Sequence, residues 1–103
     1  MQYRQGDVFL ELVAEIPEKL KTIPATSGRL ILAHGESTGH HHSIKSGSSQ
    51  LMSTPNDEMF LLIQDGDALL EHQEHAPINL PPGQYRVHIQ REYSPEAIRN
   101  VQD

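Results

Sequence analysis

Short apolar stretches, separated by turn-forming residues at fairly regular intervals, run along most of this chain. Such spacing is typical of an all-β domain, in which strands are short and turns are frequent. The pattern predicts strands at residues 7–13, 29–34, 58–64, 68–72 and 83–93. We therefore expect a small antiparallel barrel or sandwich with one hydrophobic core.

The two strands with the clearest patterns differ in how many faces they bury. In residues 83–93, Tyr85 and Val87 alternate with polar side chains, which predicts one core-facing and one polar face. The polar row, which includes His88, is either solvated surface or the lining of a small barrel. Residues 58–64 are apolar at most positions, which predicts a central strand that is buried on both faces.

Turn residues predict how some of the strands connect. The Asp-Gly-Asp sequence at 65–67 predicts a tight hairpin between the strands on either side of it. Residues 35–57 are rich in serine and glycine and are interpreted as a long functional loop. Within that loop, residues 43–46 and 50–53 are expected to pair as a small hairpin.

Helix is expected in only two places. Residues 16–28 contain prolines and are interpreted as a connecting loop with one helical turn near 18–21. The Ser-Pro-Glu sequence at 94–96 supplies an N-cap, a proline at the first helical position and an early acid. A short C-terminal helix carrying Ile98 and Val101 on its apolar face is therefore predicted.

Length, charge and cysteine content limit what the chain can do. A length of 103 residues predicts one domain, spanning residues 1–103, and the absence of cysteine excludes disulfides and thiolate ligands. A formal charge of -6 disfavours broad duplex nucleic-acid binding. No apolar run is long enough to span a membrane and no secretion signal is visible, so we expect no membrane partner and a cytoplasmic location.

Seven histidines stand out in so short a chain. A ligand set of imidazoles and carboxylates suits a divalent transition metal such as zinc, iron, manganese or nickel. If the segment is extended, His40 and His42 lie on one face and form a chelating pair, while His41 faces the other way. The alternative is a solvated, serine-rich loop whose histidines have no ligand role.

A second group of ligand-type residues follows the strand at 68–72. His72 and His75 stand three positions apart with Glu74 between them, and together with the first pair they predict a site of three or four ligands. Such a site is either closed by protein or keeps an open position for water. His88 is a conditional further ligand, and His34, at the end of a strand, is expected to be a bystander.

The order of these motifs resembles that of the cupins. A His-x-His segment, then a Pro-Pro-Gly turn at 81–83 and a strand with a histidine, is similar to the two cupin motifs. The resemblance implies a jelly-roll-like β-barrel with a metal held by His40, His42 and His88. The cupin glutamate has no counterpart after His42, and His88 stands farther from Gly83 than in that family.

Motifs over most of the chain are also similar to a small family of uncharacterised bacterial and phage proteins. That likeness implies His72 and His75 as ligands beside His40 and His42, with Glu74 nearby. The motifs are Thr38-Gly39-His40-x-His42, His72-x-Glu74-His75, Leu80-Pro-x-Gly83-x-Tyr85 and Gln90-Arg91-Glu92-Tyr93.

These residues favour a metal-dependent hydrolase. The ion would acidify a bound water, and Glu74 or Glu92 would act as general base or orient the water. A phosphodiester or small nucleotide substrate would use a nearby cation, for which Arg86 and Arg91 are the candidates on opposite faces of their strand.

Three other expectations stay open beside the hydrolase. The chain could be a non-catalytic binding or inhibitory module that the metal stabilises, or a cupin-like metal oxygenase. The third expectation is a homodimer, because a small β domain with a double-sided apolar strand often completes its core by pairing.

Overall fold

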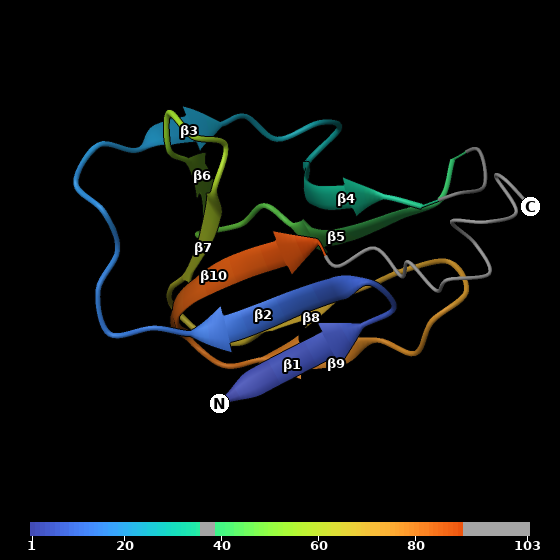
Figure 1. Ribbon diagram of the computed structural model, residues 1–103. Helices are drawn as coiled ribbons and strands as arrows, with labels where there is room; N and C mark the ends of the chain where they lie inside the picture. Colours follow the sequence, from blue (N-terminus) through green and yellow to red (C-terminus); the bar gives the residue numbers. More distant parts are fainter. Residues whose placement is uncertain (36–38, 90–103) are drawn as a thin grey trace, which may run out of the picture.

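The computed structural model describes residues 1–35 and 39–89 of the chain, and it places strands but no helix among them (Figure 1). The predicted C-terminal helix lies outside these described residues. The strands are β1 (Gln2–Gln5), β2 (Val8–Leu12), β3 (Lys21–Ile23), β4 (Arg29–His34), β5 (His41–Lys45), β6 (Gln50–Ser53), β7 (Met59–Ile63), β8 (Ala68–Leu70), β9 (Ile78–Leu80) and β10 (Gly83–Ile89).

The strands form two layers, so the all-β prediction is confirmed. Six antiparallel strands make the larger sheet in the order β1-β2-β10-β7-β6-β3. No pairing among the described strands joins β1 to β3, so this sheet is not a closed barrel. The second layer consists of the β4–β5 and β8–β9 pairs, and Figure 1 shows β8 and β9 behind β1 and β2.

The core lies between the two layers. Tyr85 and Val87 of β10 are buried in it, as the alternation of that strand predicts. Phe60 is buried as well as its neighbour Leu61, so β7 buries side chains on both faces as expected. The core comprises Val8, Leu10, Leu30, Leu32, Ile44, Leu51, Leu61, Ile63, Leu70, Leu80, Tyr85 and Val87.

Both predicted hairpins are wrong. β7 pairs with β6 and β10, whereas β8 pairs with β9 in the other layer, although the chain does bend at Asp65 and Gly66, which both have positive φ. Likewise, β5 pairs with β4 while β6 pairs with β7 and β3. Turn residues determine where the chain reverses, but in both cases the chain crosses between layers instead of pairing with itself.

The prediction of a long functional loop at residues 35–57 is also wrong, because this segment contains β5 and β6. The helical turn near 18–21 is replaced by bends and by the start of β3. Three strands were not predicted, namely β1, β3 and β9. They are only three or four residues long, which is too short for an apolar period to be visible.

Within the described residues there is no helix long and apolar enough to cross a membrane. The cytoplasmic location stays a prediction.

Candidate functional site

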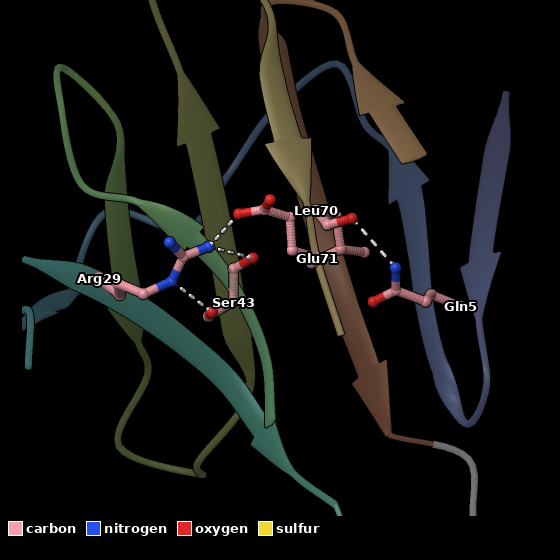
Figure 2. Close-up of polar contacts among 5 residues, drawn as sticks. All are labelled: Gln5, Arg29, Ser43, Leu70 and Glu71. Atoms are coloured by element: carbon pink, nitrogen blue, oxygen red, sulfur yellow. Dashed lines mark hydrogen bonds and ion pairs between the residues drawn. The ribbon is translucent and has the colours of Figure 1, made fainter. Parts of the chain in front are cut away.

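The two halves of the second layer are joined by one isolated bridge between β5 and the end of β8. Ser43 and Glu71 exchange both backbone hydrogen bonds, with N···O distances of 3.0 and 2.9 Å. The Arg29 guanidinium lies across the bridge, donating from Nε to Ser43 Oγ at 2.7 Å and from Nη2 to the Glu71 carboxylate (Figure 2). We call these three residues the arginine clamp.

The clamp fixes the register that creates the histidine cluster. With Ser43 opposite Glu71 in antiparallel pairing, His42 stands opposite His72. In an antiparallel ladder, side chains are closer in the residue pair next to a hydrogen-bonded pair than in the hydrogen-bonded pair itself. The rings of His42 and His72 are therefore held against each other. Their centroids are 4.3 Å apart.

Two more histidines complete the cluster. The His40 ring lies 5.7 Å from that of His72, and the His75 ring lies 4.7 Å from His72 and 5.8 Å from His42. We call these four residues the histidine cluster. The structure therefore brings together four of the predicted ligands, while their binding of a metal stays a prediction.

His42 is the most tightly held member of the cluster. It is 2% exposed, and its Nδ1 is 2.8 Å from Gln5 Oε1. The amide nitrogen of Gln5 donates to the carbonyl oxygen of Leu70 (Figure 2) and to that of Ala76, each at 3.0 Å, so the amide has only one orientation that satisfies both. Gln5 Oε1 consequently faces His42 and accepts the Nδ1 proton. The other ring nitrogen, Nε2, faces Asp7 Oδ1 at 3.4 Å.

The environment favours the neutral forms of His42 and His72. Burial, followed by the charge of His72, lowers the pKa of His42 below its usual value although Asp7 acts in the opposite direction. Desolvation and then the nearby His75 lower the pKa of His72. Neutral imidazole is the form that binds metal ions, so these shifts favour ligation.

Two glycines make room for the rings. Gly6 has φ +60°, and a Cβ at this position would lie 2.9 Å from His75 Nε2 and 3.2 Å from His42 Cε1. A Cβ on Gly35 would lie 3.0 Å from His72 Nε2. A side chain at either position would occupy the space that the histidines use.

Glu74 lies at the outer rim of the cluster. Its side chain is 66% exposed, and Oε2 is 3.7 Å from His40 Nδ1. The Glu74 backbone N–H donates to His72 Nδ1 at 3.0 Å. In this arrangement a neutral His72 carries its proton on Nε2, so ligation through Nε2 requires that proton to move and this hydrogen bond to break.

The cluster does not already form a coordination sphere. Across residues 1–35 and 39–89, no group of three or more histidine, cysteine, aspartate or glutamate side chains has the arrangement to hold an ion. The cause is visible in the ring contacts, because His42 is stacked on His75 at 23° and tilted on His72 at 37°. The donor atoms are near one another, but rings must turn before the atoms converge.

The remaining predicted site residues lie elsewhere. His88 is on the outer face of β10, with Nε2 3.8 Å from Glu11 Oε1, and no described contact joins it to the cluster. Glu92 lies outside the described residues. His41 has no described ring contact with the cluster, although its charge acts on His72, and it pairs in register with the exposed His34.

Two residues of the site were not predicted from the sequence. Gln5 ends β1, and Asp7 follows Gly6 in the turn before β2. Their local sequence shows only a turn before an apolar strand. The long-range pairing that brings this turn to His42 has no signal in the sequence.

Comparison with known proteins assigns the chain to a family without assigning an activity. No curated protein and no solved structure matches it. One family, described as a domain of unknown function, DUF8820, has a sequence model that matches residues 4–90, a range that includes the whole histidine cluster, Gln5 and Asp7. The chain therefore belongs to the DUF8820 family.

Proposed function

We propose that this domain binds one divalent transition metal ion at the histidine cluster. The observation that carries the proposal is His42, whose buried ring is held by Gln5 with Nε2 directed away from the core and towards Asp7. A hydrogen bond that fixes one ring nitrogen so that the other can bind is the usual support of a metal-ligating histidine. Zinc, iron, manganese and nickel suit the imidazole and carboxylate donors.

Two further histidines would complete the coordination. His75 is exposed and His72 is half-buried, and both belong to the segment between β8 and β9. Turning these side chains costs less than moving a ring packed in the core. Movement of His72 and His75 towards the fixed His42 would gather three imidazoles around one ion.

The proposed activity of this centre is hydrolysis by a metal-bound water. Exposure at the rim would leave room for a water, and Glu74, near His40, would be its general base. The sequence offers two candidate cations for a phosphodiester or nucleotide substrate. Arg86 is paired with Glu58 at 2.8 Å, and Arg91 lies outside the described residues.

A non-catalytic, metal-stabilised module is a second candidate. The observation in its favour is that Asp7, His42 and His75 come from three segments far apart in sequence. An ion among them would cross-link the two layers, so its binding energy would stabilise the fold. A closed set of four protein ligands would favour this module over the hydrolase.

The cupin likeness has a narrower role in this proposal. Two antiparallel layers are compatible with a cupin-like fold, but His88 faces Glu11, and no described contact joins it to His40 or His42. A cupin-type oxygenase centre would need all three. We therefore propose that the imidazole ligands come from among His40, His42, His72 and His75 in its place.

Metal titration with histidine variants tests the proposal. Purified protein should bind one zinc per chain by calorimetry and elemental analysis. His42→Ala and His75→Ala should lower the affinity by about a hundredfold or more, whereas His41→Ala and His88→Ala serve as matched controls and should change it little. Equal losses in all four variants, or no stoichiometric binding by the unaltered protein, would contradict the proposal.

A hydrolysis assay tests the proposed activity separately. Zinc- or manganese-loaded protein should cleave an activated phosphodiester, and Glu74→Gln should slow cleavage by about a hundredfold with little change in metal affinity. Stoichiometric metal with no cleavage of such esters would favour the structural module.

A further inference from the structure

A carboxylate lies against the best-held histidine of the cluster. Asp7 Oδ1 is 3.4 Å from His42 Nε2, and the two side chains are 38% and 3% exposed, respectively. Asp7 follows Gly6, whose positive φ turns the chain between β1 and β2 and brings the carboxylate over the ring.

The hydrogen bonds of Gln5 determine which atoms face each other here. A neutral imidazole has one N–H, and in His42 that N–H is Nδ1, because the opposing Gln5 oxygen can only accept. His42 Nε2 therefore presents a lone pair to Asp7. A carboxylate oxygen also offers only lone pairs, so two acceptors face each other without a proton between them. A cation between them satisfies both.

The separation of these two atoms suits a metal ion. Ligand atoms bound to zinc at about 2.0–2.2 Å with tetrahedral angles lie about 3.4 Å from each other. The observed distance between His42 Nε2 and Asp7 Oδ1 is 3.4 Å. These two atoms thus have the spacing of neighbouring ligands before any ring of the cluster moves.

Building on the metal-binding function proposed above, we infer that Asp7 is a direct carboxylate ligand and forms with His42 the preformed half of the centre. His75 and His72 supply the movable half. A mixed nitrogen and oxygen set selects borderline or hard divalent ions, such as zinc, iron(II) and manganese, over soft ions such as copper(I). Gln5 is the positioning residue, because it directs His42 Nε2 towards Asp7.

Substitution of Asp7 by asparagine tests the inference. Asp7→Asn should weaken zinc binding at least about tenfold and change the visible absorption spectrum of the cobalt(II)-loaded protein, which depends on the ligand set. The matched control is Asp65→Asn, which makes the same charge change in the bend between β7 and β8. This variant should have neither effect.

The melting temperature of the metal-free variant separates a ligand from a structural role. The new amide can donate to His42 Nε2, so metal-free Asp7→Asn should melt at the same temperature as the unaltered protein or higher. A lower melting temperature together with unchanged zinc affinity would assign Asp7 to an ion pair with a protonated His42 and overturn the inference.

Nitrogen NMR of the imidazole side chains tests the tautomer. His42 should carry its proton on Nδ1 both before and after zinc is added, and only the Nε2 signal should shift on binding. A proton on Nε2 in the neutral, metal-free protein would overturn the inference. If the unaltered protein binds zinc but Asp7→Asn binds it equally well, the Asp7 role alone fails, whereas absence of zinc binding by the unaltered protein removes the proposed function itself.

Discussion

The contact between β5 and β8 has two neighbouring parts that differ in how their polar atoms are satisfied. In the arginine clamp, every contact joins a donor to an acceptor, as Arg29 donates to Ser43 and to Glu71. In the histidine cluster, one residue further along the strands, the rings of His42 and His72 lie against each other and His42 Nε2 faces the Asp7 carboxylate. The clamp is complete within the protein, whereas the proposed cation would supply the partner that His42 Nε2 and Asp7 lack.

This difference indicates separate tasks for the two parts. Polar groups that are fully paired hold a register, and the clamp aligns His42 with His72. Polar groups that remain under-paired at a partly exposed edge are the ones available to a ligand. The predictions below test whether the arginine clamp stabilises the protein without metal, and whether the histidine cluster stabilises it only when metal is bound.

Zinc should produce the largest change. At a free zinc concentration of a hundred times Kd, the free energy of unfolding should rise by about 2.7 kcal/mol. In His42→Ala this increase should disappear, because the best-held ligand is lost. Urea denaturation with zinc and with a chelator measures both values, and an equal increase in the variant would place the ion elsewhere.

Loss of the clamp should destabilise the protein whether or not metal is present. Arg29→Met removes charged hydrogen bonds from a side chain that is only 26% exposed, which should lower the free energy of unfolding by about 2 kcal/mol. The matched control is Arg86→Met, whose partner Glu58 is exposed, and its effect should stay below about 1 kcal/mol. A loss that occurs only in the presence of zinc would remove the distinction between clamp and cluster.

A methyl group at Gly6 should affect stability and metal binding together. Gly6→Ala should cost about 1–2 kcal/mol through its positive φ, and it should weaken zinc binding because the new Cβ meets His75 and His42. Gly28 has φ +78° and nothing within 4 Å of an added Cβ, so Gly28→Ala should cost similar stability but leave zinc affinity unchanged. Equal zinc affinities in the two variants would contradict the placement of the site at Gly6.

The pH dependence of the metal-free protein should be the smallest effect. The pKa values of His42 and His72 are lowered in the folded state, so the unfolded chain takes up protons first as the pH falls through 6.5. Stability should therefore be fully present above that pH and decline only modestly as the pH falls towards the lowered folded pKa values.

Denaturation curves from pH 8 to pH 5 measure this dependence, with His34→Ala as the control that should leave it unchanged. A rise in stability on acidification would mean that His42 is protonated in the folded protein and forms an ion pair with Asp7. Zinc should also be released over the same range, since protonated imidazole does not bind metal.

The strands and the faces of the histidines could be predicted because they depend on local side-chain alternation. β2, β4, β7 and β10 appear close to their predicted positions, and the rings of His40 and His42 both lie against the ring of His72. These properties follow from the two-residue period of an extended chain, which is present in the sequence itself. The sequence also contained the cluster residues His72 and His75 as a recognisable pair.

Only the tertiary structure decided which segments meet. Turn residues indicate a reversal but do not select the partner strand, and so both hairpins were wrong and the bridge between Ser43 and Glu71 was not foreseen. Gln5 and Asp7 belong to a short polar strand and a turn, and they acquire a role only because that turn packs against His42. The sequence alone determined which side chains could bind a metal, whereas long-range pairing decided which of them lie close enough to share one.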